Sequence, residues 1–375
     1  MQKKILIIYA TYGSGHKAIA NYIKEYFINQ DSNLEIKMID MLDYGNKFGI
    51  ISKKLSENIM LKHPVIWNLF FKISNHKITS KIYNKITMNW FKLKKLESLV
   101  SKYNPDLVIS THFYGSILTR NLNKNKIINS KLITIITDYG VNNVWFEHYS
   151  GKDYFIVASK EEKKCLLKSV SKDSIKVFGI PIFPKTVEPN EISKIKLRLG
   201  IKNKYPICVC FAGGGNGSTA TLPYIKRMLK NKLDFNYIFI SGNNPKAYHK
   251  INKMIKKYNV SNCYLYGYVN NVPEMLMISD FVITKPGGAQ TTECLYFNKP
   301  MLFIKSSGGQ ENYNIDYFVK KGYARFFKNQ RKLCKYLKRE SKNMLDINKM
   351  RNKLENTDNT KAMKELYDFA KSLLR

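Results

Sequence analysis

Short apolar runs alternate with helix-length amphipathic segments along almost the whole chain. A first series of apolar runs lies at 5–9, 35–39, 107–110, 132–136 and 154–157, and a second at 207–211, 237–240, 263–266, 281–284 and 301–304. This alternation is typical of strands in a parallel sheet that are joined by crossover helices. The pattern therefore predicts an α/β protein built from two doubly wound halves.

A change in composition separates the two series. The run from Gly179 to Pro184 ends the first, and a polar, proline-containing stretch leads into the second, as expected of a linker. We therefore predict one domain over 1–186 and another over 187–328. The remaining residues, 329–375, have a helical pattern without strands and could pack against either half.

The charge of the chain indicates an anionic partner. Lys and Arg number 63 against 28 Asp and Glu, for a net charge of +35. Nucleic acid, a membrane surface and a phosphorylated substrate all fit this charge. The six cysteines are scattered without metal-ligand spacing, which indicates reduced thiols. The start of the sequence enters an apolar run too short for a signal peptide, and no run of 18 apolar residues occurs, so we expect a cytosolic or peripheral protein.

A glycine turn after the first apolar run contains Gly13, Ser14, Gly15 and His16. It matches the dinucleotide-binding pattern GxGxxA, with Asp40 as a possible ribose ligand, but a single match of this kind is weak. A purely structural turn is a second interpretation. The interpretation that also uses the histidine is a set of backbone amides at a helix start, with His16 placed to accept a hydroxyl proton.

A second glycine loop follows the first strand of the second half. Gly213, Gly214 and Gly215 precede Asn216, and a following helix would direct its positive end at the same point, which suits a diphosphate. The loop lacks the GK[ST] of a P-loop, so it does not predict ATP hydrolysis. An ordinary strand-to-helix turn is the alternative.

A third loop, 284–293, again follows a strand and enters a helix. It contains Lys285, Gly287 and Gly288, and Glu293 is placed to accept both hydroxyls of a ribose. The next strand is followed by Gln310 and Glu311, whose side chains suit the hydroxyls of a sugar. Ligands of open sheets bind at this carboxyl edge, so the three loops outline a nucleotide, a diphosphate and a hexose.

Residues 51–100 combine lysines with aromatic residues. This segment contains ten Lys and two Glu, for a net charge of +8, and its aromatic residues include Trp67, Phe70, Phe71 and Trp90. Such mixing suits lipid headgroups or single-stranded nucleic acid, but no nucleic-acid-binding motif accompanies it. We therefore predict an anionic membrane surface as the partner and no nucleic acid; a solvated helix face with a few core aromatics is the alternative.

Taken together, the motifs resemble the family of monogalactosyldiacylglycerol synthases and processive diacylglycerol glucosyltransferases, which is related to the peptidoglycan lipid-precursor N-acetylglucosaminyltransferase. The matching stretches keep their order and extend over about residues 3 to 325. They lie at 12–16, 104–112, 137–140, 178–182, 213–215, 284–288 and 309–311.

The resemblance implies a GT-B fold, in which two Rossmann-like domains face a central cleft. It implies that the second domain mainly holds a UDP-sugar and that the first holds diacylglycerol or a glycolipid. The implied donor residues are Gly214, Gly215 and Asn216 at the diphosphate, Glu293 at the ribose, Gln310 and Glu311 at the sugar, and Tyr268, Lys285, Gly287 and Gly288 elsewhere at the donor. The implied acceptor-side residues are His16 and Asp138, with Gly13, Ser14 and Gly15 beside them. The loop Gly-Gly-Gly-Asn-Gly-Ser departs from many relatives, which carry a bulkier or more acidic residue there.

The chemistry expected from this set is an inverting transfer that needs neither a metal nor a cofactor. The sequence has no Asp-x-Asp pair, so amides, helix ends and Lys285 would stabilise the departing UDP, and His16 or Asp138 would act as the base. We expect a peripheral enzyme on the cytoplasmic face of the membrane that moves a hexose to diacylglycerol or a glycosyldiacylglycerol. The alternatives are N-acetylglucosamine transfer to a polyprenyl-linked precursor, a UDP-sugar epimerase and a nucleic-acid-binding protein.

Overall fold

The protein is described from a computed structural model of the chain. The structure describes residues 2–44, 63–76, 79–80, 94–184, 188–201, 204–212, 219–358 and 360–375, apart from the side chains of Pro64, Phe70 and Pro189. The chain forms two compact units. Unit 1 comprises Met1–Phe183, Ser307–Asn314 and Thr360–Arg375, and unit 2 comprises Pro184–Ser306 and Ile315–Asn359.

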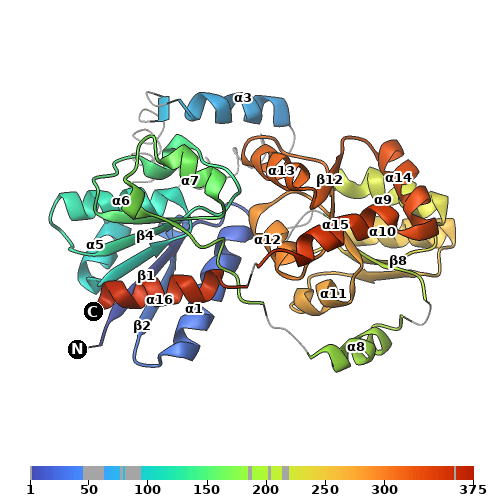
Figure 1. Ribbon diagram of the computed structural model, residues 1–375, viewed down its shortest axis with the longest axis horizontal. Helices are drawn as coiled ribbons and strands as arrows, with labels where there is room; N and C mark the ends of the chain where they lie inside the picture. The colour runs from blue at the N-terminus through green and yellow to red at the C-terminus, as the bar shows by residue number, and fades with distance from the viewer. Residues whose placement is uncertain are drawn as a thin grey trace. The chain divides into compact units, whose positions relative to one another are not determined.

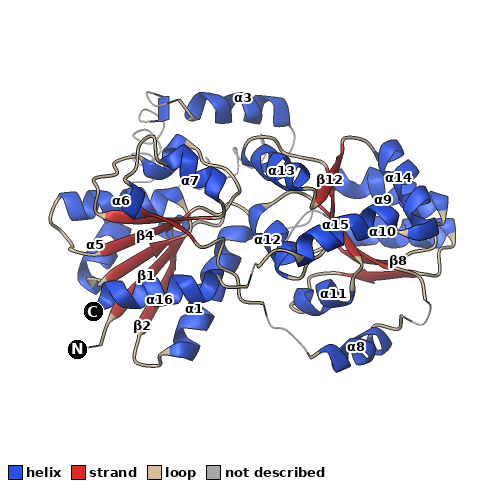
Figure 2. Cartoon of the chain, viewed as in Figure 1, coloured by secondary structure: helices blue, strands red, loops and turns tan. Residues whose placement is uncertain are grey.

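Unit 1 contains a parallel sheet in the order β2-β1-β3-β4-β5-β6 (Figures 1 and 2). Its strands are β1 (Lys4–Tyr9), β2 (Glu35–Asp40), β3 (Leu107–Ser110), β4 (Lys131–Ile135), β5 (Asp153–Val157) and β6 (Ile175–Val177). Its helices are α1 (Gly15–Gln30), α3 (Pro64–Ser74), α5 (Lys94–Tyr103), α6 (Phe113–Lys124), α7 (Lys160–Leu166) and α16 (Ala362–Leu374).

Strand β1 shows why this half folds as it does. Its residues from Ile5 to Tyr9 are all buried, because helices cover both faces of a parallel sheet. Leu6 and Ile8 share one core with residues of α5 and α6. Helix α1 contacts β1, while α16 contacts β3 and α1. The sheet is therefore closed off from solvent on its faces, and its carboxyl edge is left for function.

Unit 2 contains a second parallel sheet in the order β12-β11-β10-β7-β8-β9. Its strands are β7 (Ile207–Phe211), β8 (Asn236–Ile240), β9 (Cys263–Tyr266), β10 (Phe281–Thr284), β11 (Met301–Ile304) and β12 (Ala324–Phe327). Its helices are α8 (Ile192–Arg198), α9 (Leu222–Asn231), α10 (Pro245–Tyr258), α11 (Val272–Ile278), α12 (Gly288–Tyr296), α14 (Gln330–Asn343) and α15 (Leu345–Glu355). Helix α13 (Gln310–Lys321) begins in unit 1 and continues in unit 2.

The ten strands expected from the sequence are confirmed to within one residue at each end. The edge strands β6 and β12 were not predicted, because Ile-Lys-Val and Ala-Arg-Phe-Phe are short and interrupted by a charge. The last helical stretch divides between the units: α14 and α15 belong to unit 2 and α16 to unit 1. Within the described ranges, no helix has the length and apolar character needed to cross a membrane.

Helix α16 is held to α1 by aromatic rings. Phe27 is 1% exposed, and its ring lies 5.1 Å from that of Tyr367 at 84°, an edge-to-face contact. Phe27→Ala should lower the free energy of unfolding of unit 1 by about 3–5 kcal/mol, since it removes a fully buried ring. Urea denaturation followed by tryptophan fluorescence reports this unit, because all three tryptophans precede residue 183.

The control for this measurement is Asn29→Ala, at an exposed position of the same helix. It should change the free energy of unfolding by at most about 0.5 kcal/mol. Equal effects of the two substitutions would contradict the packing described for α1 and α16.

Candidate functional site

The carboxyl edge of the unit 1 sheet brings together three loops that are distant in sequence. Strands β1, β3 and β4 are neighbours, and the residues that follow them include His16, Thr111 and Thr137. Parallel strands end at a common edge, which explains the convergence. His16 is the second residue of α1, so the glycine turn delivers it directly to this edge.

His16 is held in one tautomer. Its Nδ1 lies 2.6 Å from the carbonyl oxygen of Thr111 and 3.2 Å from Thr137 Oγ1. A carbonyl oxygen only accepts, so Nδ1 carries the proton and Nε2 presents a lone pair. Burial lowers the pKa of His16 to about 4, and the Thr111 hydrogen bond and the charge of Asp40 oppose that shift. The ring is therefore neutral at physiological pH and can accept a proton at Nε2.

Asp40 has a structural role in this arrangement. Its carboxylate accepts from the hydroxyl of Thr11 and, at 3.0 Å, from the amide of Leu42. These bonds tie the end of β2 to the loop after β1. Both oxygens are thus occupied by the chain itself, which weakens the dinucleotide-binding interpretation of the glycine turn.

Asp138 lies next to Thr137 and is fixed by Asn314. The side-chain amide of Asn314 donates to Asp138 Oδ1 at 2.9 Å, and its oxygen accepts from the backbone amide of Tyr139 at 2.7 Å. Burial first, and the negative charge of Glu311 second, raise the pKa of Asp138 to about 6, while the Asn314 bond opposes the shift. Asn314 was not among the predicted site residues, although it lies only three residues after Glu311 in the polar stretch that follows β11.

The segment Ser307–Asn314 belongs to unit 1, so Gln310 and Glu311 are grouped with His16 and Asp138. The sequence placed them in the 187–328 domain, because they follow β11. Glu311 accepts from the amide of Ser307 through Oε2. Gln310 Oε1 is buried and has no hydrogen-bond partner among the described residues. An acceptor left open in this way suits a ligand hydroxyl.

Helix α3 packs against this segment through Trp67 and Phe71. A Cβ at Gly309, whose φ is +59°, would lie 2.7 Å from Trp67 Nε1 and 3.2 Å from Phe71 Cγ. Asn68 Oδ1 also accepts from the amide of Gly309 at 3.3 Å and from Asn312 Nδ2 at 3.1 Å. Trp67 and Phe71 therefore point at the site segment, and they do not form the outer surface of α3.

The outer surface of α3 is apolar and consists of residues that the sequence analysis did not single out. Val65 is 81% exposed, Leu69 60% and Ile73 50%, at a spacing of four, and Ile66 is 56% exposed beside them. The predicted Trp90 and the side chain of Phe70 lie outside the described residues. In the sequence, this surface could have been found from the spacing of Val65, Leu69 and Ile73, which places the three side chains on one face of a helix.

In unit 2 the predicted donor residues Lys285, Gly287, Gly288 and Glu293 follow β10 at the carboxyl edge of the second sheet. Gly287 caps α12 and Gly288 begins it, and Lys285 directly follows β10. Glu293 is one and a half turns into that helix, and its Oε2 accepts from Gln290 Nε2 at 3.3 Å. The residues Gly214, Gly215 and Asn216 lie outside the described residues.

A hollow of about 380 Å³ lies at the ends of β8 and β9. Its lining residues are Ser241, Gly242, Asn243, Asn244, Pro245, Tyr248, His249 and Gly267. Tyr268, a predicted donor residue, follows directly and is 65% exposed. Small and amide side chains at a carboxyl edge suit a polar ring such as a nucleobase.

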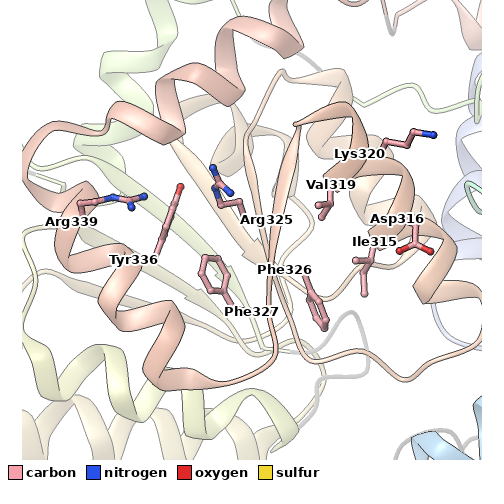
Figure 3. A pocket seen from close by; sticks show the side chains of 9 residues that line it. All are labelled: Ile315, Asp316, Val319, Lys320, Arg325, Phe326, Phe327, Tyr336 and Arg339. Carbon is pink, nitrogen blue, oxygen red and sulfur yellow. The ribbon is translucent and has the colours of Figure 1, made fainter.

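A larger hollow of about 740 Å³ lies beside the edge strand β12 (Figure 3). Its two arginines stand over the ring of Tyr336, but carboxylates already hold them: Arg325 pairs with Asp346 and Arg339 with Glu340. We assign this hollow no part in the site. In the described ranges, no group of three or more His, Cys, Asp or Glu side chains could hold a metal ion.

Comparison with known proteins finds a different match for each half of the chain. Residues 16–182 match the family described as Monogalactosyldiacylglycerol (MGDG) synthase, and residues 208–373 match the Glycosyltransferase family 28 C-terminal domain. Processive diacylglycerol beta-glucosyltransferases of Bacillus cereus (strain AH187) and Bacillus thuringiensis (strain Al Hakam) are each 26% identical over 332 residues, 86% of this chain and 81% of theirs.

Solved structures share the fold at low sequence identity. UGT89C1 of Arabidopsis thaliana complexed with UDP has a TM-score of 0.63 at 12% identity, with 100% of both chains covered. MurG of Acinetobacter baumannii has a TM-score of 0.62 at 13% identity, with 98% of this chain and 99% of that one covered. HepE of Anabaena in complex with UDP-glucose has a TM-score of 0.57 at 12% identity, covering 98% and 99%.

These likenesses confirm the GT-B fold expected from the sequence. The two domain families follow each other along the chain, and the curated relatives span most of it. The chain is therefore a glycosyltransferase: its first half matches the monogalactosyldiacylglycerol synthase family, its second half matches the glycosyltransferase family 28 C-terminal domain, and most of its length is similar to processive diacylglycerol beta-glucosyltransferases.

Proposed function

We propose that the chain transfers a hexose from a UDP-sugar to diacylglycerol or a glycosyldiacylglycerol, with inversion and without a metal. The observation that carries the proposal is the edge of the unit 1 sheet, where a neutral His16 with an open lone pair contacts Thr137, the residue before Asp138. Relatives named processive diacylglycerol beta-glucosyltransferase support the acceptor class.

The donor would bind unit 2. The hollow at Ser241 and Gly267 would take the uracil, and Glu293 would accept the ribose hydroxyls. The amides at the start of α12 and the ammonium of Lys285 would lie toward the diphosphate, where a helix N-terminus stabilises negative charge. Likeness to UDP and UDP-glucose complexes of other proteins is consistent with this assignment.

Gln310 and Glu311 would bind the hexose itself. The buried Oε1 of Gln310 is an acceptor that a sugar hydroxyl can fill, and Glu311 adds a carboxylate beside it. Because the carboxylate of Glu311 also raises the pKa of Asp138, the sugar-binding residues and the acceptor-side residues are electrostatically coupled.

We assign the base to His16. In the displacement, the acceptor O–H bond breaks, the new bond forms between that oxygen and the anomeric carbon, and the bond to UDP breaks with its electron pair. Nε2 of His16 takes the proton, and the Thr111 carbonyl and Asp40 stabilise the resulting cation, since both raise the pKa of His16. Asp138, with Oδ1 held by Asn314, orients the loop after β4.

Departure of UDP would be stabilised by protein groups alone. Lys285 and the amide-rich starts of helices supply positive potential where the leaving group's charge develops. A UDP-N-acetylglucosamine donor with a polyprenyl-linked acceptor remains the second candidate, because MurG shares the fold.

The membrane would be contacted through α3. Its outer face, formed by Val65, Ile66, Leu69 and Ile73, would enter the interface, with exposed Lys72, Lys94 and Lys95 meeting anionic headgroups. Because the inner face of α3 contacts Gly309, the same helix would bring the site segment toward the lipid. We propose a peripheral enzyme at the cytoplasmic face of the membrane.

The transfer itself is tested with labelled donors over diacylglycerol vesicles. UDP-glucose or UDP-galactose should give a labelled glycolipid, and excess EDTA should leave the rate unchanged. N-acetylglucosamine transfer to a polyprenyl-linked acceptor should be absent. Loss of activity in EDTA that Mg²⁺ restores would contradict the metal-independent mechanism, and calorimetry without heat of UDP binding would contradict the donor assignment.

The assignment of the base is tested by His16→Asn. The asparagine amide can keep the bond to the Thr111 carbonyl but offers no lone pair in place of Nε2, so kcat should fall by about 10²–10⁴-fold. Asp138→Asn, the matched control, should retain much more activity.

The pH dependence gives an independent readout of the base. Wild-type kcat/KM should stay level as the pH falls through 6, because His16 remains unprotonated until its pKa of about 4. A decline below the Asp138 pKa of about 6 would instead identify Asp138 as the base, since a carboxylate must be ionised to accept a proton.

Membrane binding is tested by Leu69→Asp combined with Ile73→Asp. Cosedimentation with phosphatidylglycerol vesicles should weaken by at least about tenfold, because each apolar side chain that enters the interface contributes roughly 1.5–3 kcal/mol. Leu197→Asp is the matched control, at a 75% exposed leucine of unit 2, and should sediment like the wild type. Equal binding by all three proteins would rule out the α3 surface.

A further inference from the structure

His112 lies beside His16, and the proposed proton transfer does not use it. It is the N-cap of α6, is 5% exposed, and its Nδ1 accepts a hydrogen bond from the backbone amide of Tyr114 at 3.3 Å. Since the amide can only donate, Nδ1 of His112 carries the lone pair. In the neutral ring the proton is therefore on Nε2.

Burial keeps His112 neutral. It lowers the pKa of His112 well below the usual value, and the neighbouring His16 lowers it further, because two adjacent rings resist carrying charge together. His112 can thus act as an uncharged hydrogen-bond donor over the whole physiological range.

The two histidines have opposite tautomers and fixed orientations. Their ring centroids are 4.8 Å apart with an interplanar angle of 79°. His112 is also stacked on Tyr12 at 5.4 Å and on Phe113 at 4.3 Å, which prevents its ring from turning. Within the part of the chain that the structure describes, neither Nε2 atom makes a hydrogen bond. One open atom accepts and the other donates.

We propose that His112 contacts the acceptor lipid: its Nε2–H donates to the oxygen next to the attacking hydroxyl, while His16 Nε2 receives the hydroxyl proton. In diacylglycerol the oxygen meant is the carbonyl oxygen of the ester on the adjacent carbon, and in a glycosyldiacylglycerol it is the adjacent sugar hydroxyl. The inference rests on the proposed function and deepens it, because it identifies a residue that recognises the acceptor.

The assignment to a neighbouring oxygen follows from reactivity. A hydrogen bond donated to the attacking oxygen itself would draw electron density from it and slow the displacement. Donation to an adjacent oxygen instead fixes the direction of attack without weakening the attacking oxygen as a nucleophile. A lipid that lacks this adjacent oxygen would leave the buried donor of His112 unpaired and would therefore bind less well.

Two substitutions separate this role from the capping of α6. His112→Asn keeps an oxygen that can accept from the Tyr114 amide, so the cap remains, but it removes the Nε2–H donor. His112→Gln places an amide N–H near the former Nε2 but loses the cap. The thermal midpoint reports the cap, and the acceptor kinetics report the donor.

The experiment measures kcat/KM of the full chain for diacylglycerol and for the matching dialkylglycerol, whose ether oxygens replace the ester carbonyls. Wild type should prefer the ester by about tenfold, the value of one hydrogen bond. His112→Asn should melt closer to the wild type than His112→Gln, because it keeps the cap and loses only the ring contacts with Tyr12 and Phe113. Its kcat/KM for the ester lipid should fall until the preference for the ester is lost. His112→Gln should melt lower and keep part of the preference.

Wild-type kinetics and ester preference in His112→Asn would overturn the inference and leave the proposed function intact. An equal loss on both lipids, with a lower thermal midpoint, would also overturn it, since that pattern describes a structural cap. A wild type that glycosylates neither lipid from any UDP-sugar would overturn the proposed function and this inference with it.

Discussion

The hydrogen bond from His16 Nδ1 to the carbonyl of Thr111 is the interaction on which the site depends. It joins the loop after β1 to the loop after β3, and the hydroxyl of Thr111 returns a bond to the His16 carbonyl at 3.1 Å. Without it the imidazole could carry its proton on either nitrogen, and the open lone pair would have no fixed place. The backbone carbonyl that follows β3 thereby determines which nitrogen of His16, in the loop region after β1, carries the proton.

The second constraint is the segment Ser307–Asn314, which follows β11 of one sheet yet belongs to the unit of the other. Asn314 donates a hydrogen bond to Asp138, and Gly309 packs against the rings of Trp67 and Phe71 in α3. A single short stretch thus contacts helix α3 and the loop of Asp138, and it contains the residues proposed for the sugar. Gly140 belongs to the same arrangement, because a Cβ there would lie 2.4 Å from Tyr313.

Sequence alone predicted the elements whose physics is local. Strand β7, for example, is an uninterrupted apolar run, and the glycines before His16 predict the turn there. Three features depend on tertiary contacts and could not be predicted in this way. They are the grouping of Gln310 with unit 1, the contact of Trp67 with Gly309, and the hydrogen bond from Asn314 to Asp138. Each depends on residues that are far apart in sequence. A basic-aromatic composition indicated a membrane surface, but it could not show that Trp67 and Phe71 contact Gly309.

Unit 1 is discontinuous, and this affects how the chain reaches its native state. Helix α16 covers Phe27 of α1, yet the ribosome makes it more than 300 residues later, after the whole of unit 2. Until then the first sheet lacks part of its apolar cover, whereas unit 2 has all its residues earlier. The first half to be translated is therefore the last to be completed, and an early-folding intermediate would expose the surface of α1 that α16 later protects.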